Sequence, residues 1–321
     1  MRLTSILACA ALAPLLVAAS EPKRLQPSSR WVLDYAPDSC RLIRIFGEGA
    51  DQTRLILESV APGDLTMVVL GKPVRASADD KKISARFLPL QQTGFFGAAQ
   101  RSEDNQPAVL WGSVPLAAKI VVDDKQVPPA MLDAMRKARA LAHSGVRPPA
   151  VDAAQHAKIR TEEDVLEAGT TALEIKASGH APVILETGSL KDAMKMFEQC
   201  DRDLLKDLGL DPDVQDRIAR PAWAPNPASW FTAKIYPRSS LLKGEEVSVL
   251  IRLLVDASGR VTKCTSLSQF DAPEFKKAVC DAATKYAIFQ PAELADGTRV
   301  PSYFINRIQF RIAGPNDAPV H

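Results

Sequence analysis

Histidine is scarce in this chain, and the residue patterns of the common catalytic sites are missing. The chain contains no His-Glu-x-x-His helix, no Gly-x-Ser-x-Gly elbow and no glycine-rich phosphate loop. We therefore expect no enzymatic activity, no metal ion, no cofactor and no small-molecule substrate. The four histidines are scattered without the spacing of metal ligands: His143, His156, His180 and His321.

An excess of charge of either sign is also missing. The chain has 40 Lys and Arg against 38 Asp and Glu, a net charge of +2, and it has no dense basic run. Nucleic acid is therefore not an expected partner, because proteins that bind it gather positive charge on one face. We interpret Asp123-Asp124 and Glu162-Glu163-Asp164 as solvated surface charge, since calcium needs six or more converging oxygen atoms.

No apolar run is long enough for a membrane-spanning helix, which needs about 20 residues. Near the N-terminus, Arg2 precedes an apolar stretch from Ile6 to Val17, and Ala18-Ala19-Ser20 supplies small residues for cleavage. This layout predicts a secretory signal peptide over residues 1–20 and a periplasmic location for the mature protein. The alternative is that the segment stays uncleaved as an anchor.

The chain has five cysteines but no Cys-x-x-Cys motif, so neither a thioredoxin-type site nor a zinc ribbon is supported. Loss of the signal peptide removes Cys9 and leaves an even number, which in an exported protein indicates two disulfides. Cys264 falls on a predicted strand and Cys280 on the following helix, so we expect this pair to join helix to sheet. Cys40 and Cys200 are left for each other. Reduced, buried thiols are the alternative.

Residues 21–211 are predicted to form a β-rich domain, arranged as a sandwich or a small barrel. Short apolar or β-branched runs separated by glycine and proline indicate its strands. We interpret Thr93–Gly97 as a turn and Gln100–Gln106 as an exposed loop. The predicted strands cover Trp31–Leu33, Cys40–Phe46, Leu55–Ser59, Leu65–Leu70, Ile83–Leu88, Val109–Val122 and a hairpin of Thr171–Lys176 with Pro182–Leu185.

Two helices are predicted inside this domain, near residues 130–142 and 189–208. The second shows an apolar stripe at helical spacing, and Ser189 with Asp192 has the pattern of a capping box. The alanine- and charge-rich sequence that ends at Gly169 fits either a helix or a linker.

Residues 212–229 contain three prolines and are predicted to be a connector between two domains. After them, the run Val247–Val255 has an apolar row at period two that alternates with a second set including Ser248 and Arg252, and the turn sequence Asp256-Ala257-Ser258-Gly259 leads into a second strand. A helix start at Asp271 and a last strand over Ser302–Ile312 follow. Residues 230–313 are therefore predicted to be a small two-layer unit, an antiparallel sheet with a helix on one face, followed by a tail over 314–321. The whole chain is predicted to be α+β.

The order of short motifs in this second domain resembles the TonB C-terminal domain family. The family pattern is Tyr-Pro before a strand, an Asp-x-x-Gly-x-Val hairpin, a helix, then Phe-x-Pro-Ala and a closing strand. Two departures are present: the chain shows no clear membrane helix or long proline-rich spacer of the kind that energy-transducing members carry, and Glu246 stands where the family usually has glycine. The matching residues are Tyr236, Pro237, Asp256, Gly259, Val261, Phe289, Pro291 and Ala292.

The resemblance implies a way of binding. In the family the last strand of this domain pairs with a short segment of an outer-membrane receptor. Carried onto this chain, it implies a partner-binding edge at Tyr303, Ile305, Arg307 and Gln309, on the face away from the helix. The alternative is that the N-terminal domain or a second copy of the chain covers this edge.

We therefore expect an exported cell-envelope protein that binds a protein or peptide by β-strand addition, in connection with outer-membrane transport. Two alternatives remain open from the sequence. One is an energy transducer that keeps its N-terminal segment as an anchor. The other is an envelope hydrolase with a TonB-like targeting module, in which Ser240 and Lys243 form a Ser-x-x-Lys pair.

Overall fold

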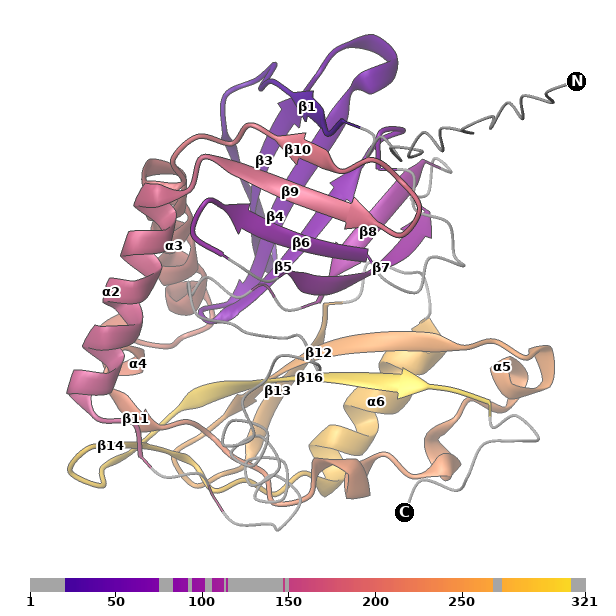
Figure 1. The fold of residues 1–321 in the computed structure, drawn as a ribbon. Helices are drawn as coiled ribbons and strands as arrows, with labels where there is room; N and C mark the ends of the chain where they lie inside the picture. The colour runs from indigo at the N-terminus through magenta and orange to yellow at the C-terminus, as the bar shows by residue number, and fades with distance from the viewer. Residues whose placement is uncertain are drawn as a thin grey trace, which may run out of the picture.

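The fold is given by a computed structural model, which describes residues 21–74, 83–91, 94–101, 106–112, 114, 147, 150–267 and 273–312. The predicted signal peptide, the predicted helix near 130–142, Asp123-Asp124 and the tail over 314–321 lie outside these residues. The predicted α+β class is confirmed, with a β-rich part followed by a smaller sheet covered by a helix (Figure 1). Across the described ranges, no helix combines the length and the hydropathy that a membrane crossing requires.

Among the described residues of the N-terminal unit, which spans 21–211, ten strands form one sheet. Neighbouring strands are antiparallel except β1 and β10, which are parallel. Their order in the sheet is β1-β10-β9-β6-β7-β8-β5-β4-β3-β2. The strands are β1 Lys23–Leu25, β2 Val32–Ala36, β3 Ser39–Phe46, β4 Thr53–Ala61, β5 Asp64–Leu70, β6 Ile83–Leu88, β7 Phe95–Arg101, β8 Pro107–Trp111, β9 Ala172–Ala177 and β10 Val183–Leu185, with a 3-10 turn at Gly49–Asp51.

The sheet curls back on itself into a barrel, as Figure 1 shows. The segment after β1 reaches β3 at the opposite end of the sheet, where Ser28 N donates to Ile45 O (2.9 Å) and Gly47 N donates to Gln26 O (2.8 Å). Inside, residues at period two point to a common core that includes Leu42, Leu57, Met67 and Trp111, all buried.

Strand β7 occupies residues 95–101, where most of the predicted turn over 93–97 and the start of the predicted loop over 100–106 fall; residues 93 and 102–105 lie outside the described ranges. Glycine is common in turns, but Gly97 lies within this strand. The absence of a side chain there leaves room for the Trp111 ring, which packs against it. A Cβ at Gly97 would lie 2.6 Å from Trp111 Nε1, so only glycine allows this contact. Trp111 Nε1 also donates to the Phe95 carbonyl at 3.2 Å.

The long helices α2, Ala153–Gly169, and α3, Lys191–Asp207, lie beside the barrel. The capping box is on α2, where the Asp152 carboxylate accepts from Gln155 N at 2.7 Å, and not on α3. At the start of α3, Ser189 accepts from Lys191 N (3.3 Å) and donates to the Glu167 carbonyl (3.2 Å). The apolar stripe of α3 packs on β3 and β4, and the predicted Cys40–Cys200 disulfide fixes it there with a Cα–Cα distance of 6.0 Å.

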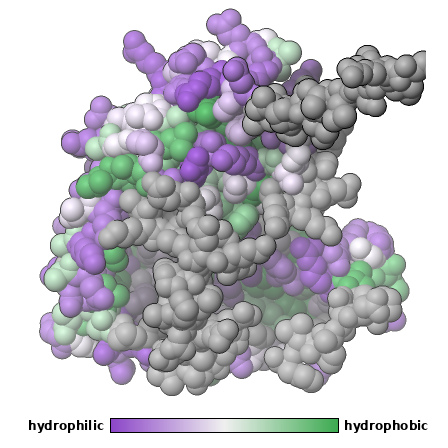
Figure 2. Space-filling model, in the orientation of Figure 1, coloured by the Kyte–Doolittle hydropathy of each residue, from purple (hydrophilic) through white to green (hydrophobic). Residues whose placement is uncertain are grey.

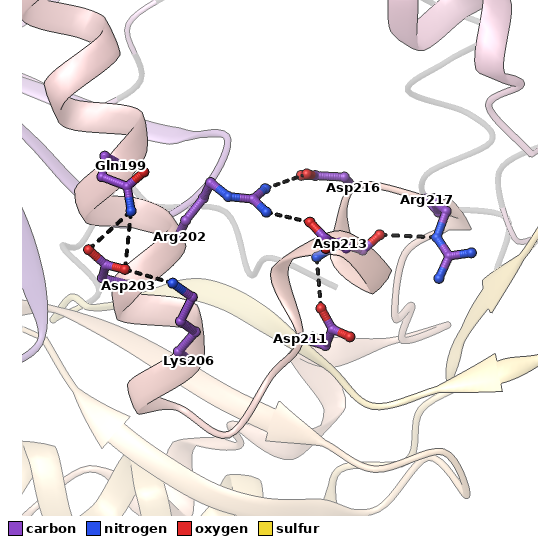
Figure 3. A network of polar contacts seen from close by, with 8 residues as sticks. All are labelled: Gln199, Arg202, Asp203, Lys206, Asp211, Asp213, Asp216 and Arg217. Carbon is purple, nitrogen blue, oxygen red and sulfur yellow. Dashed lines mark hydrogen bonds and ion pairs between the residues drawn. The ribbon is translucent and has the colours of Figure 1, made fainter.

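The predicted connector is folded. It contains α4, Pro212–Gln215, and β11, Ile218–Arg220, and β11 pairs with a strand near residue 293. Figure 3 shows the ion pairs that join α3 to α4, in which the Arg202 guanidinium contacts the carboxylates of Asp213 and Asp216. Because β11 shares a sheet with residues near the C-terminus, we treat 212–312 as the C-terminal unit. The domain limits at 211 and 229 remain a prediction.

The C-terminal unit has the predicted order of hairpin, helix and strand. Its main sheet runs β13-β12-β16, and a small second sheet runs β11-β14-β15. The elements are 3-10 turns at Pro227–Trp230 and Ala233–Ile235, α5 Arg238–Lys243, β12 Val247–Val255, β13 Val261–Ser266, α6 Pro273–Tyr286, β14 Ala292–Leu294, β15 Arg299–Val300 and β16 Ser302–Phe310.

The family motifs meet in space at the β12–β13 turn. Gly259 has a φ of 87°, and a Cβ there would lie 2.2 Å from the Phe289 carbonyl oxygen. The Asp256 carboxylate accepts from Ser258 N (2.8 Å) and Arg260 N (3.0 Å), which fixes the turn. The Asp-x-x-Gly and Phe-x-Pro-Ala motifs, which are separate in the sequence, therefore contact each other in the fold.

Helix α6 covers one face of the β13-β12-β16 sheet. Its Phe275, Val279 and Ala283 are buried against Ile251, Leu253 and other strand residues. The predicted Cys264–Cys280 disulfide joins β13 to α6 with a Cα–Cα distance of 5.5 Å. Aromatic rings fill the space at the end of the sheet, where Phe275 and Phe310 have ring centroids 4.7 Å apart.

Candidate partner-binding edge and inter-unit cleft

Strand β16 is an edge strand of the described structure. It pairs with β12 on one side, from Ser302 opposite Val255 to Phe310 opposite Val247. In the part of the chain that the structure describes, no strand pairs with its other side. An unpaired edge presents a row of backbone N–H and C=O groups that an added strand can use.

The hydrogen bonds of β12 identify which β16 residues point to that edge. Leu267 N donates to Leu250 O at 2.8 Å, so Leu250 directs its backbone groups toward β13 and its neighbour Ile251 directs them toward β16. Ile251 lies opposite Asn306, so the even-numbered β16 residues face β12. The odd-numbered residues face outward. They are Tyr303, Ile305, Arg307 and Gln309, the residues singled out from the sequence, and their binding role stays a prediction.

The side chains of these four residues lie on the sheet face opposite α6. Alternation along the strand places Ile308 and Phe310 in the core on the α6 side, where both are buried. The face opposite α6 turns toward the N-terminal unit, above it in Figure 1. The N-terminal unit thus contacts this face of the sheet, while the backbone edge of β16 lies beside that contact.

Arg252 forms the centre of the contact between the two units. It lies on β12 opposite Ile305, and its side chain is only 1% exposed. The guanidinium donates to the carbonyls of Val60 (2.7 Å) and Asp38 (3.0 Å) and to the Asp38 carboxylate (2.7 Å). Burial lowers the pKa of Arg252, and the Asp38 charge opposes this shift. In the sequence, this contact is indicated only by an arginine inside an otherwise apolar strand. Its partners on the N-terminal unit become visible only in the folded structure.

Tyr303 forms a second contact between the units. Its hydroxyl donates to the Pro62 carbonyl at 2.7 Å, and burial raises its pKa, with the nearby charges of Asp201 and Asp64 acting in the same direction.

Two carboxylates of the N-terminal unit lie near that hydroxyl. Burial raises the pKa of Asp201 to about 7, although a hydrogen bond with Ser59 lowers it. Burial also raises the pKa of Asp64, and the Arg307 charge lowers it. One oxygen atom of each carboxylate is buried without a hydrogen bond to a described residue.

A cleft of about 930 Å³ opens between the two units, a volume in the usual range of ligand sites. Strands β7 and β8 form one wall, with Phe96, Ala98 and Leu110. The other wall contains the last residues of β16 and the α5 segment. Figure 2 shows apolar surface at the tip of the C-terminal unit, where α5 exposes Leu241 and Leu242 by 48% and 81%.

Most charged side chains of this cleft are already paired. The Arg311 guanidinium contacts the Glu246 carboxylate at 3.0 Å, and Lys243 contacts Glu245 at 3.7 Å. The Glu274 carboxylate accepts from the Ser239 hydroxyl. Arg307 is different, because it makes no ion pair with a described residue although its side chain lines the cleft.

Ser240 and Lys243 both line the cleft, but their arrangement is not that of a Ser-Lys catalytic pair. Ser240 is buried, whereas the Lys243 ammonium is exposed and lies next to Glu245. No hydrogen bond joins these two described residues. The described ranges also contain no group of three or more His, Cys, Asp or Glu side chains with the geometry of a metal site.

The motif resemblance in the C-terminal unit is tested by comparison with known proteins. A comparison with curated proteins finds no match to the chain. A protein-family model does match, over the residues that carry the hairpin, helix and edge strand. Residues 232–312, the C-terminal quarter of the chain, match the family described as Gram-negative bacterial TonB protein C-terminal, and the resemblance predicted from the sequence is confirmed.

Proposed function

We propose that this chain is an exported, non-enzymatic protein of the cell envelope that binds a protein or peptide partner by β-strand addition at β16. The proposed partner is an envelope protein, with an outer-membrane receptor as the first candidate, which would connect the chain to outer-membrane transport. The observation that carries the proposal is the unpaired edge of β16, because it lies in the quarter of the chain that matches the TonB C-terminal family.

The direction of the backbone groups supports this proposal. Tyr303, Ile305, Arg307 and Gln309 direct their amides and carbonyls outward without weakening the pairing of β16 with β12. A partner strand therefore adds to the sheet without any rearrangement of its core. The two disulfides fit the oxidising compartment in which exported proteins fold.

The test compares Ile305→Pro with Ile305→Ala. Both variants lose the isoleucine side chain, but only proline removes the outward amide, and the β12 pairing is left intact in both. The wild-type chain and Ile305→Ala are expected to recover the same outer-membrane or periplasmic protein from envelope extract, identified by mass spectrometry. Ile305→Pro is expected to lose that protein. Recovery of no envelope protein by the wild type, or equal recovery by Ile305→Pro, would contradict the proposal.

Export has a test of its own. Sequencing of the mature N-terminus is expected to begin near Glu21, after the small residues of the predicted cleavage site. A mature chain that keeps residues 1–20 would support the anchored alternative instead.

A further inference from the structure

The outer surface of β7 offers an exposed aromatic ring to the cleft. Phe95 points into the barrel core and is buried, so the next residue, Phe96, points outward, and it is 59% exposed. Ala98 and Leu110 lie on the same outer face, because Ala98 is opposite Leu110 in the register of β7 and β8. The three side chains form an apolar wall across the cleft from β16.

Arg307 stands on the other side of the same cleft. It has no ion pair with a described residue, whereas Arg311 and Lys243 have theirs. Burial raises the pKa of the nearby Asp64 carboxylate, and the Arg307 charge opposes this shift. Arg307 is thus a cation without an ion pair among the described residues, and it lines the same cleft as the apolar wall.

The same residue also faces the open edge of the sheet. The backbone groups of Arg307 point outward, and its side chain points into the cleft. A strand added along β16 would place every second side chain into the cleft, directly beside Ile305, Arg307 and Gln309. Opposite charges across neighbouring strands stabilise the pairing, and like charges oppose it.

We propose that the cleft selects an extended peptide segment with a carboxylate side chain opposite Arg307, flanked at the positions two residues before and after by apolar side chains that contact the wall of Phe96. The N-terminal unit is then part of the binding site and contributes to its specificity. This inference rests on the proposed strand addition at β16, and it adds the chemistry of the segment that binds there.

The experiment uses three synthetic nine-residue peptides of alternating valine and threonine that differ only at the central position, which is glutamate, glutamine or lysine. Binding to the full mature chain is measured by calorimetry at low salt. The glutamate peptide is expected to bind most tightly and the lysine peptide most weakly, with about a fivefold difference between them. The difference is expected to shrink as salt is added, because Arg307 is exposed.

Two substitutions separate charge recognition from strand addition. Arg307→Glu is expected to reverse the order, so that the lysine peptide binds most tightly, and Arg307→Gln is expected to remove the difference. Because Arg307 is exposed, both variants are expected to fold, which melting curves check.

The apolar wall is tested with a matched pair of aromatic truncations. Phe96→Ala is expected to weaken all three peptides by about fivefold or more. Tyr35→Ala is the control, since Tyr35 is equally exposed, at 59%, but lies on β2 outside the cleft. Tyr35→Ala is expected to leave the affinity for all three peptides unchanged.

The outcomes distinguish this inference from the proposed function. Equal binding of the three peptides, together with loss of all binding in Ile305→Pro, would overturn the selectivity and leave strand addition intact. An effect of Phe96→Ala no larger than that of Tyr35→Ala would overturn the role of the N-terminal wall. Failure of every peptide to bind the wild-type chain would count against strand addition as well.

Discussion

A buried guanidinium needs hydrogen-bond partners for its donors, and the two terminal nitrogens of Arg252 find them on the other unit, whereas its Nε is buried without a partner among the described residues. The partners of the terminal nitrogens are the Asp38 and Val60 carbonyls and the Asp38 carboxylate, all in turns or strand ends of the barrel. A charge of this kind favours the relative position of the two units in which these donors have their partners, because a buried charge without partners is costly. The Asp38 side chain is half exposed, so the energy of the ion pair itself is modest.

Arg252→Ala is expected to lower the free energy of unfolding by about 2–4 kcal/mol, since it leaves two carbonyls without their donors and empties a buried space. Chemical denaturation of the full chain measures this change. Arg54→Ala is the control, because Arg54 is an exposed arginine on a barrel strand. Equal stability of the two variants would show that Arg252 does not hold the units together.

The buried carboxylate of Asp201 predicts a pH dependence of stability. Its pKa is raised from 3.8 to about 7 in the folded protein, so the folded state binds more protons than the unfolded state between these values. The contribution of this group therefore falls as pH rises from about 4 to about 7, and is constant above and below. Glu167 also has a pKa raised to about 7, so only a comparison of variants isolates Asp201.

Asp201→Asn is expected to be more stable than the wild type at pH 8 and to show a flatter decline between pH 4 and pH 7. Thermal melting at a series of pH values from 4 to 8 measures both effects. A difference between variant and wild type that does not change with pH would contradict the burial of this carboxylate as the cause.

Among the elements, strong periodicity decides what is predictable from the sequence. Strands β12 and β16 and helix α6 follow from period-two and helical spacing, and most barrel strands follow from apolar runs between glycines and prolines. Strand β7 was not predictable, because Gly97 serves the packing of the Trp111 ring rather than a turn. Strand β11 was not predictable either, since it has three residues and its partner β14 lies far along the chain.

The candidate site likewise has one part that is predictable from the sequence and one part that is not. The β16 edge follows from the family motifs, whose order is visible in the sequence. The apolar wall of Phe96 does not, because it faces the edge only once the barrel and the C-terminal sheet are docked. Residues that meet across two units leave no periodic signal in either one.

The disulfide between β13 and α6 holds the smaller core together. It closes a loop with a sequence separation of 16, for which loop-closure entropy gives a contribution of about 3 kcal/mol. The double substitution Cys264→Ser with Cys280→Ser is therefore expected to lower the free energy of unfolding by roughly that amount. Urea denaturation measures it, and mass spectrometry checks that the Cys40–Cys200 bond is retained. An unchanged unfolding transition would mean that the sheet and α6 do not need the bridge.

At the scale of the whole molecule, the C-terminal sheet lies between two layers. Helix α6 covers one face, and the barrel contacts the other through Arg252 and Tyr303. With both faces in contact and β12 central, a partner can reach this sheet in the described structure only along its outer strands, of which β16 also lines the cleft. The arrangement favours a protein that presents the β16 edge beside a cleft formed by both units.

The central claim is tested most directly by amide hydrogen exchange at single residues of β16, measured by NMR on the full chain. Without a partner, the amides of Ile305, Arg307 and Gln309 are expected to exchange quickly, while those of Phe304, Asn306 and Ile308 are protected by β12. Addition of a bound partner segment is expected to slow the three outward amides selectively. Outward amides that are already protected in the free chain, or that keep their exchange rates when a partner is bound, would contradict strand addition at this edge.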